Sequence, residues 1–446
     1  MGNWFNLRSL FSLIIILNIF PTDGNLFAET RDADTLRVDS QVKTGWTFGA
    51  LPAVAYNTDE GFRYGGLANF FYYGDGKTYP YYHHSVYLEW SRTTKGNGLN
   101  NLFFDSRTLI PNTRTTIDLM YLTEQALDFY GFNGYEAPYY QYFEDTDHPD
   151  YVSRMYYRHE RKLLRITADV QRRFYHDHWK WIGGIGFFGV QTGPVNVEQL
   201  NEGLREDDQL PDVPGIYEEY VEMGLIPGDL SEGGQTTFFK AGLIHDTRDN
   251  EPNPMRGTWN EAFLSIAPGF LGNGDYAYTQ LVAIHRHYFT LVPEVLSLAN
   301  RLGYQGKLSG EMPFYMLPFI YNSFKTYDGF GGNKTVRGVR RNRIQGDGIA
   351  YGNFELRYKF FRREIARQDV YLSLNGFVDG ARVLQRHPVE HENLPFDPKD
   401  ESVHWAMGAG LRVVLNKNFV VALDYGQALR KQDGDSGLYI GLNFLY

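Results

Sequence analysis

The most regular feature of the sequence is a strict alternation of polar and apolar residues in the stretch 351–360. Every second residue there is polar or carries a polar tip, and the residues between them are apolar or glycine. The first set is Tyr351, Asn353, Glu355, Arg357 and Lys359, and the second is Gly352, Phe354, Leu356, Tyr358 and Phe360. Because successive side chains of a β-strand point to opposite faces, this pattern predicts a strand with one polar and one apolar face.

The following segment, 369–382, repeats the alternation. One predicted face carries Ser373, Asn375 and Asp379, and the opposite face carries Leu372, Leu374 and Val378. A soluble sheet packs its apolar face against a core, whereas a transmembrane β-barrel turns that face to lipid and its polar face to the lumen. We interpret these two segments as strands of a transmembrane barrel.

Segments of this kind recur along the chain from Thr44, separated by turn-forming residues. We predict sixteen strands, at 44–56, 61–73, 81–93, 99–109, 113–124, 151–174, 179–191, 235–246, 257–269, 276–291, 297–310, 348–361, 369–382, 404–415, 418–427 and 436–446. The stretch 151–174 is counted as one strand, although the residues HERK at 159–162 could form a turn that splits it, because closed bacterial barrels usually have an even number of strands. The predicted fold is all-β, a sixteen-stranded antiparallel transmembrane β-barrel.

The predicted connections alternate in length in the second half of the chain. Short connections at 175–178, 362–368 and 416–418 alternate with long ones at 192–234, 311–347 and 383–403. Short periplasmic turns and long outer loops produce this asymmetry in outer-membrane barrels. One of the long outer loops is expected to contain a short helix within 213–228.

Composition fits a barrel and excludes other classes. The 446 residues include 33 Tyr, 32 Phe and 47 Gly, and the mean hydropathy is −0.41. Half-polar strands and aromatic belts give such values, although a secreted soluble β-protein would share them. The formal net charge of −10 argues against a general nucleic-acid binder. Because the sequence contains no cysteine, neither disulfides nor a lipidated N-terminal cysteine are expected.

The two ends of the sequence carry export and sorting features. The apolar run 10–20 is too short to span a bilayer, so residues 1–28 are predicted to be a signal peptide. Residues 29–43 would then form a short periplasmic tail, and residues 44–446 the barrel domain. The final segment, 437–446, alternates again, and we expect one of its faces to lie against lipid: Leu438, Ile440, Leu442, Phe444 and Tyr446. Its candidate sorting residues are Gly441, Phe444 and Tyr446.

An unusually cationic stretch, GGNKTVRGVRRNR at 331–343, lies between two predicted strands. Its cations are Lys334, Arg337, Arg340, Arg341 and Arg343. The interspersed glycines permit positive φ angles and close approach of the backbone. We therefore predict a loop that folds into the polar lumen, where the carboxylates of the neighbouring strands lie.

Several stretches of the second half are similar to one known family. They are GLIHDTRDNEPNPMRGT at 242–258, GGNKTVRGV at 331–339, YGNFELRYKF at 351–360, NGFVDGARV at 375–383 and ALDYGQAL at 422–429. With the final strand, they resemble the BamA/TamA superfamily of outer-membrane barrels, the bacterial surface antigen family. Val336, Arg337 and Gly338 match the motif of the family's sixth outer loop, and Val339 stands where the family usually has Phe.

The resemblance implies that this loop folds back through the lumen and that Arg337 pairs with Glu355 and Asp379. Alternation places both carboxylates on the polar faces of their strands. Because a guanidinium can hold carboxylates bidentately, the three residues would form a latch for the loop. A second set is expected to form a structural turn network at the periplasmic rim: Asp246, Arg248, Asp249 and Gly257.

Other candidate sites are weaker. Arg340, Arg341 and Arg343 have an alternative interpretation as the constriction of a pore, because rings of charge set selectivity in channels. His176 and His178 lie on a predicted tight turn without supporting metal ligands. The sequence contains no motif for a nucleophile elbow, a zinc protease or a nucleotide-binding loop. We expect no enzyme activity, no metal and no cofactor.

The resemblance implies a protein of the bacterial outer membrane that assists insertion, assembly or translocation of other outer-membrane proteins. A weak seam between the first and last strands would let an incoming strand pair with the barrel. Family members with this role usually carry periplasmic POTRA domains, for which residues 29–43 leave no room. Expected partners are the lipid bilayer, unfolded outer-membrane proteins and a separate periplasmic POTRA-type or accessory protein, but no nucleic acid. Two alternatives stay open, a passive or loop-gated pore and a structural surface-antigen barrel.

Overall fold

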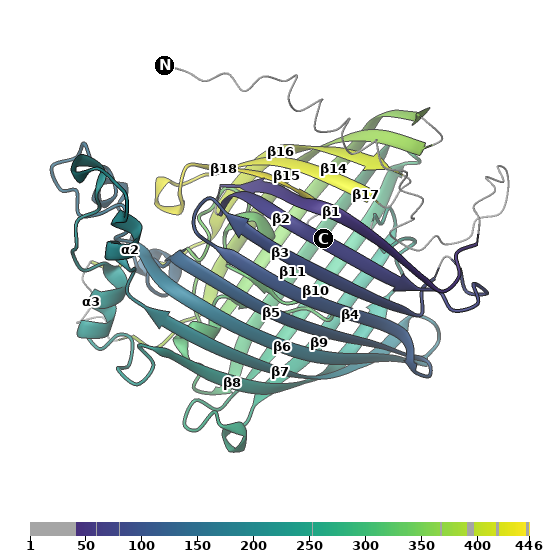
Figure 1. Cartoon of the computed structure of the whole chain (residues 1–446), viewed down its shortest axis with the longest axis horizontal. Helices are drawn as coiled ribbons and strands as arrows, with labels where there is room; N and C mark the ends of the chain where they lie inside the picture. The colour runs from purple at the N-terminus through teal and green to yellow at the C-terminus, as the bar shows by residue number, and fades with distance from the viewer. Residues whose placement is uncertain are drawn as a thin grey trace.

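Sixteen strands close into one antiparallel β-barrel (Figure 1). A computed structural model describes residues 42–58, 60–79, 81–251, 253–365, 368–389, 397–415, 419–442 and 446. Around the barrel, β1 to β11 follow in chain order, β14 to β18 come next, and β18 returns to β1. The strands are β1 (Trp46–Asn57), β2 (Gly61–Tyr72), β3 (His84–Thr93), β4 (Gly98–Ile110), β5 (Thr113–Asp128), β6 (Arg158–Tyr175), β7 (Trp179–Gly193), β8 (Gly233–Asp246), β9 (Gly257–Ala267), β10 (Tyr278–Val292), β11 (Leu296–Gly310), β14 (Gly348–Ile365), β15 (Gln368–Gln385), β16 (His404–Leu415), β17 (Phe419–Ala428) and β18 (Ser436–Leu442).

Every predicted strand corresponds to a strand of the barrel, so the predicted fold class is confirmed. The segment 151–174 does form one strand, since residues 159–162 lie inside β6 and pair with both neighbours. β6 starts only at Arg158, however. Tyr156 and Tyr157 are buried among other aromatic side chains of the outer loops, which explains why the strand does not extend further toward the N-terminus.

The two faces of the strands differ as the alternation predicts. On β14, the side chains of Phe354, Leu356 and Tyr358 point outward and are each about half exposed, between 45% and 46%. Asn353 and Glu355, which flank Phe354, point into the barrel and are fully buried. The apolar outer face suits lipid, and the polar inner face suits the contents of the lumen.

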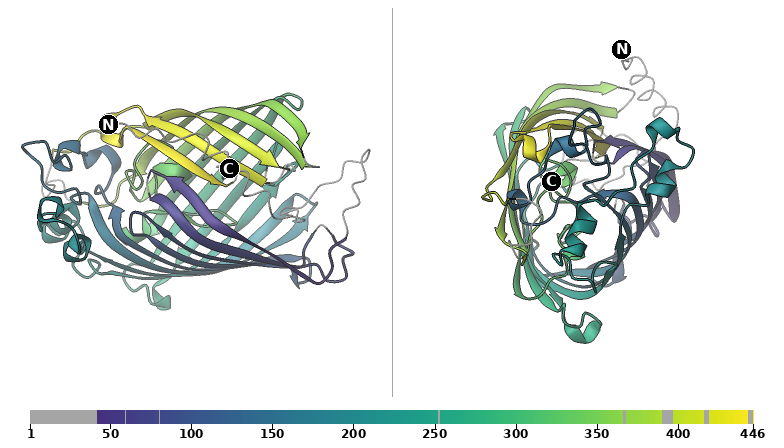
Figure 2. Two further views of the ribbon diagram at one scale, coloured as in Figure 1. Left: turned by 45° about the horizontal axis from the view of Figure 1, so that its top comes forward. Right: turned by 90° about the vertical axis from the view of Figure 1, so that its left-hand side faces the viewer.

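The long connections gather at one end of the barrel. Between β7 and β8 lie the short helices α2 (Val197–Asn201) and α3 (Ile216–Glu222), and α3 confirms the helix expected within 213–228. Figure 2 (right) looks onto this end and shows the loops and helices lying across the barrel mouth. Many of their aromatic side chains, among them Phe129, Tyr157 and Tyr217, form one buried cluster. The cluster gives the outer loops a hydrophobic core of their own.

The connection between β11 and β14, residues 311–347, runs inside the barrel, and we call it L6. It includes the two-stranded sheet β12 (Phe319–Ile320) and β13 (Tyr327–Asp328). Inward-facing side chains of the wall hold its backbone. Gln171 of β6 donates to the Ser323 carbonyl at 2.7 Å, and Gln305 of β11 donates to the Phe319 carbonyl at 2.7 Å. L6 therefore fills the lumen and is fixed to two parts of the wall.

The ends of the sequence carry predictions that lie outside the described residues. The signal peptide expected at 1–28, residues 29–41 of the expected tail and Phe444 belong to this group. Within the described ranges, no helix is long and apolar enough to cross a membrane.

Candidate functional site

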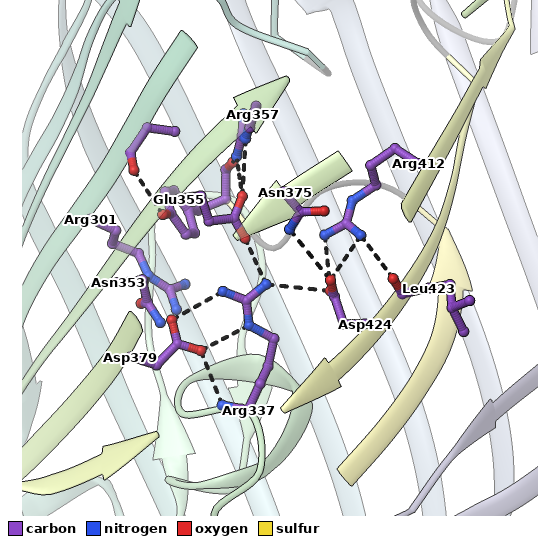
Figure 3. Close-up of polar contacts among 12 residues, drawn as sticks. Arg301, Arg337, Asn353, Glu355, Arg357, Asn375, Asp379, Arg412, Leu423 and Asp424 are labelled. Carbon is purple, nitrogen blue, oxygen red and sulfur yellow. Dashed lines mark hydrogen bonds and ion pairs between the residues drawn. The ribbon is translucent and has the colours of Figure 1, made fainter. Parts of the chain in front are cut away.

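Arg337 of L6 lies at the centre of a cluster of carboxylates on the inner face of the barrel (Figure 3). Its Nε and Nη2 atoms donate to Asp379 of β15 at 2.8 and 3.0 Å, and its backbone N–H donates to the same carboxylate at 3.1 Å. Its Nη1 atom donates to Glu355 of β14 at 2.6 Å. Arg337 is 1% exposed, and both carboxylates are 0% exposed. One guanidinium therefore joins L6 to two neighbouring strands in a site shielded from water.

A third carboxylate, Asp424 of β17, belongs to this cluster and was not among the predicted residues. It lies 3.3 Å from Arg337 Nη1 and is held bidentately by Arg412 of β16, at 2.8 and 2.9 Å. Arg357 adds a further cation, with its Nε 3.0 Å from Glu355. Three guanidinium groups thus alternate with three carboxylates. This balance offsets the cost of burying the charges. Alternation in ALDYGQAL already placed Asp424 opposite Leu423 and Tyr425, but a single acid among apolar residues indicates no partner.

The tip of L6 packs directly on the backbone of β17. Gly338 has a φ of 102°, and a Cβ atom there would lie 2.6 Å from Gly426 C and Gln427 N. A Cβ atom on Gly426 would in turn lie 2.4 Å from the Arg337 carbonyl oxygen. The Gly338 N–H donates to the Tyr439 hydroxyl of β18 at 3.0 Å. Glycine is therefore required on both sides of the contact, because any side chain would separate the loop from the wall.

Apolar residues of the loop tip close around this contact. Val336 and Val339 are buried in a cluster with Phe330, Ile344 and Tyr351. The rings of Phe330 and Tyr351 meet edge to face, with their centroids 5.8 Å apart. Phe330 thus supplies an aromatic ring to the cluster in which Val339 is buried.

The segment before Arg337 is fixed by its carbonyl groups. The Asn353 side chain donates to the Thr335 carbonyl at 2.6 Å. Arg301 of β11 donates to the Lys334 carbonyl at 3.0 Å and to the Asn353 side chain at 2.8 Å. β11 and β14 therefore hold one side of the loop tip, while β15 and β17 hold the other.

The remaining L6 arginines, Arg340, Arg341 and Arg343, each contact different residues. Arg341 Nη1 lies 2.8 Å from Glu124 and 3.6 Å from Glu60. Arg343 donates to the carbonyls of Gln432 and Gly134, each at 2.8 Å. The Arg340 guanidinium lies 4.4 Å from the centre of the Tyr139 ring. Arg341 and Arg343 are buried in these contacts. A constriction that uses all three therefore stays a prediction and requires L6 to move.

Several outer loops meet at Asp433, just above L6. Its carboxylate accepts a hydrogen bond from the Tyr135 hydroxyl and lies 2.6 Å from His404 Nδ1. The rings of Tyr135 and His404 stack with their centroids 3.9 Å apart. Burial, together with the neighbouring Asp433 carboxylate, raises the pKa of Tyr135 well above its ordinary value. The phenol therefore keeps its proton, and the contact helps to close the outer mouth.

The predicted periplasmic-rim residues lie together in the turn between β8 and β9. Arg248 donates to Asp246 through Nε and Nη2 at 2.9 and 2.8 Å. Asp249 accepts from the Met255 N–H at 3.0 Å. Gly257 has a φ of 99°, and a Cβ atom there would lie 2.3 Å from the Thr247 carbonyl oxygen. These contacts stabilise the turn itself.

One sequence prediction about the final strand is wrong. β18 ends at Leu442, and the side chain of Tyr446 lies inside the barrel instead of facing lipid. Its hydroxyl donates to the Ala299 carbonyl at 3.1 Å, and its ring lies 5.0 Å from the Arg301 guanidinium. The lumen offers the Tyr446 hydroxyl and ring polar and cationic partners that a lipid-facing position would not provide. Leu438 faces outward as predicted and is 36% exposed.

The junction between the first and last strands is short. In the described part of the chain, β1 and β18 pair at two positions, Tyr56 with Ile440 and Asn57 with Tyr439. Thr58 extends this contact, since its N–H donates to the Leu438 carbonyl at 3.0 Å and its Oγ1 accepts from the Leu438 N–H at 2.7 Å. β1 pairs with β2 over its whole length, from Trp46 to Asn57. We call the junction of β1 and β18 the seam.

Metal-binding geometry is absent from the described residues, where no group of three or more His, Asp or Glu side chains could hold an ion. The charged cluster around Arg337 instead joins polar groups of the protein to one another.

Fold and site together define a closed β-barrel whose lumen is filled by a loop that an arginine fixes to the wall. The chain belongs to the Omp85 superfamily, because the model of the Omp85 superfamily domain matches residues 84–444. No curated protein matches the sequence.

Two solved structures show the same fold at low sequence identity. BamA from Haemophilus ducreyi lacking POTRA domains 1–3 has a TM-score of 0.53 and 16% identity, covering 99% of this chain and 80% of that one. CdiB from Escherichia coli has a TM-score of 0.54 and 11% identity, covering 90% of this chain. The match spans 63% of the CdiB chain, less than two thirds of its length.

Proposed function

We propose that this protein resides in the bacterial outer membrane and assists the insertion or translocation of other outer-membrane proteins by opening its seam. The observation that carries the proposal is the seam itself, with two paired positions in the described residues. An unpaired strand edge presents free N–H and C=O groups that another strand can pair with. An incoming strand would therefore add to the edge of β1.

The rest of the barrel supports an opening at this place. L6 is bound to β11, β14, β15 and β17 through Arg301, Asn353, Glu355, Asp379 and Asp424. These contacts tie the strands on one side of the seam into a unit. β1 has no part in them, so parting β1 from β18 would leave these contacts intact. L6 also contacts β5 through Glu124 and β6 through Gln171, on the other side of the seam.

Substrates and partners follow from this mechanism. The substrate that an open β1 edge accepts is an unfolded segment in which polar and apolar residues alternate. A separate periplasmic protein of the POTRA or accessory type would deliver it. We infer that the protein acts by pairing with the client strand.

The decisive experiment locks the seam with a disulfide. The sequence has no cysteine, so the pair Tyr56→Cys and Ile440→Cys introduces a single bridge across the seam. The control pair Leu423→Cys and Ile440→Cys bridges β17 and β18, which stay together in the proposal. In cells depleted of the wild type, we expect the oxidised seam pair to lower the amounts of several unrelated barrels at constant transcript levels. The control pair should sustain those amounts.

Other outcomes separate the alternatives. If depletion lowers only one outer-membrane protein, the chain is a dedicated translocator. If depletion changes no other protein, or if both disulfides behave alike, the proposed opening is wrong. A large, steady conductance of the purified wild type in a planar bilayer would instead indicate a pore. The filled lumen leads us to expect no such conductance.

A further inference from the structure

A cleft with a volume of about 430 Å³ lies among the outer loops, beside the outer ends of β15 and β16. It is lined by Glu136 from the connection between β5 and β6, by Arg382 and Arg386 of β15 and its extension, and by residues 398–401, which precede β16. Every lining residue except Pro398 carries a charge. Both the volume and the lining suit a small polar ligand.

Part of the lining is used to build the cleft. The Glu401 carboxylate accepts from the N–H groups of Tyr135 and Val383, each at 2.9 Å. Arg386 donates through its Nε atom to Oε1 of Glu136 at 2.6 Å. These contacts join the connection between β5 and β6 to β15 and to the segment before β16. The walls of the cleft are therefore held in a fixed position.

Other polar groups of the lining are left for a ligand. Of the three lining cations, only Arg386 pairs with a described carboxylate. Arg382 donates to the Glu401 carbonyl at 3.2 Å, and the Lys399 ammonium lies 5.7 Å from the centre of the Tyr140 ring. Glu136 is 6% exposed, and its Oε2 atom has no hydrogen-bond partner among the described residues. Because a buried acceptor without a donor is costly, the cleft calls for a ligand that supplies one.

The cleft adjoins the apolar outer face of the barrel. By alternation, Arg382 lies on the same face of β15 as Val378 and Leu384, which are 41% and 56% exposed. Trp405 of β16, which pairs with Gly380, is 46% exposed. An outer face of this kind suits acyl chains, and the charged cleft at its outer end lies where the headgroups of the lipids begin.

We propose that this cleft binds the phosphorylated sugar headgroup of a lipid in the outer leaflet. Arg382 and Lys399 hold the phosphate, because both cations form charge-assisted hydrogen bonds with its oxygens. A sugar hydroxyl donates to Oε2 of Glu136, which an ionised phosphate oxygen cannot do. The acyl chains lie along Leu384 and Trp405. The inference takes only the outer-membrane location from the proposed function.

The experiment measures lipid binding to the purified full-length protein in a non-ionic detergent, by native mass spectrometry. The probe is lipid A, an acylated glucosamine disaccharide that carries phosphate groups. Three further probes each lack one part: dephosphorylated lipid A lacks the anion, phosphatidic acid lacks the sugar, and free glucosamine phosphate lacks the acyl chains. We expect each of them to bind about tenfold more weakly than lipid A. No client protein takes part, so a failure here is distinguishable from a failure of the proposed function.

Substitutions in the cleft test the role of each group. Arg382→Gln and Lys399→Gln change exposed residues, and each should weaken lipid A binding about tenfold without altering the binding of dephosphorylated lipid A. Glu136→Gln should weaken the binding of lipid A several-fold but not that of phosphatidic acid. The matched control is Arg205→Gln, which removes a cation from the connection between β7 and β8, where its side chain is 86% exposed.

Three results would overturn the proposal. The first is an unchanged affinity for lipid A in Arg382→Gln and Lys399→Gln, or an equal loss in Arg205→Gln, which would indicate general attraction between charges. The second is phosphatidic acid binding as tightly as lipid A, because the sugar would then contribute nothing. The third is free glucosamine phosphate binding as tightly as lipid A, which would make the ligand a soluble sugar phosphate. The two exposed cations keep the test decisive even if Glu136→Gln fails to fold.

Discussion

Two junctions in the barrel wall, one between β14 and β15 and one between β18 and β1, differ sharply in how firmly they are joined. β14 and β15 pair from Gly348 with Gln385 to Ile365 with Gln368, and Arg337 bridges their inner faces. At the seam, the described residues of β1 and β18 pair only at Tyr56 and Asn57. Since each barrel strand needs both neighbours to satisfy its backbone, the seam is where separation costs least. L6 contacts strands on both sides of the seam, β14 and β15 through Arg337 and β5 and β6 through Arg341 and Gln171, so in the proposed mechanism only the short pairing of β1 with β18 has to part.

The largest expected effect comes from removing the ion pairs through which Arg337 joins L6 to β14 and β15. Arg337→Ala leaves Glu355 and Asp379 buried without their main partner, which should cost about 3–5 kcal/mol. The temperature at which the barrel unfolds in detergent gels should fall, and protease should cut within L6. Arg337→Lys keeps the positive charge but not the forked guanidinium. Its unfolding temperature should lie between those of Arg337→Ala and the wild type.

A matched control for this change lies on the same strand. Arg362 of β14 also pairs with two carboxylates, Glu294 and Asp369, but its side chain is 46% exposed. Arg362→Ala should cost less than about 1 kcal/mol. If the two alanine variants unfold at the same temperature, burial of the Arg337 cluster is not what stabilises the wall.

A smaller loss is expected from separating L6 and β17 without touching a charge. Gly338→Ala places a Cβ atom 2.6 Å from the backbone of β17 at a φ of 102°, so either the loop or the strand must shift. We expect a cost of about 1–3 kcal/mol, seen as earlier thermal unfolding. Gly441→Ala is the control, since nothing lies within 4 Å of the Cβ atom it would introduce. Equal effects of both substitutions would contradict the close packing of the loop tip.

The smallest effect is expected at the seam. Thr58→Val removes the hydroxyl that accepts from the Leu438 N–H at 2.7 Å, a hydrogen bond worth about 0.5–1.5 kcal/mol. The unfolding temperature should hardly change, while the rate of disulfide formation between Tyr56→Cys and Ile440→Cys should change several-fold. Thr108→Val removes an exposed bond to the His83 carbonyl, away from the seam, and should leave that rate unaltered.

The strands and their faces could be predicted from the sequence because alternation is a local property. Phe354 and Leu356 had to face one way and Glu355 the other, whichever strands became their neighbours. The resemblance to the bacterial surface antigen family also implied that Arg337 pairs with Glu355 and Asp379. The roles of Asp424 and Arg412 were not predicted, because they depend on the closed barrel, which brings β16 and β17 to face the same loop.

The sequence by itself determined a sixteen-stranded barrel, its polar interior and a cationic loop with carboxylates to receive it. These features follow from the spacing of side chains along each strand and from the high cost of burying unpaired charge. Only the tertiary structure decided the length of the seam, the contact of Gly338 with Gly426 and the lumen site of Tyr446. Each of these joins residues distant in the chain, and their meeting depends on how the sheet closes, which no local pattern encodes.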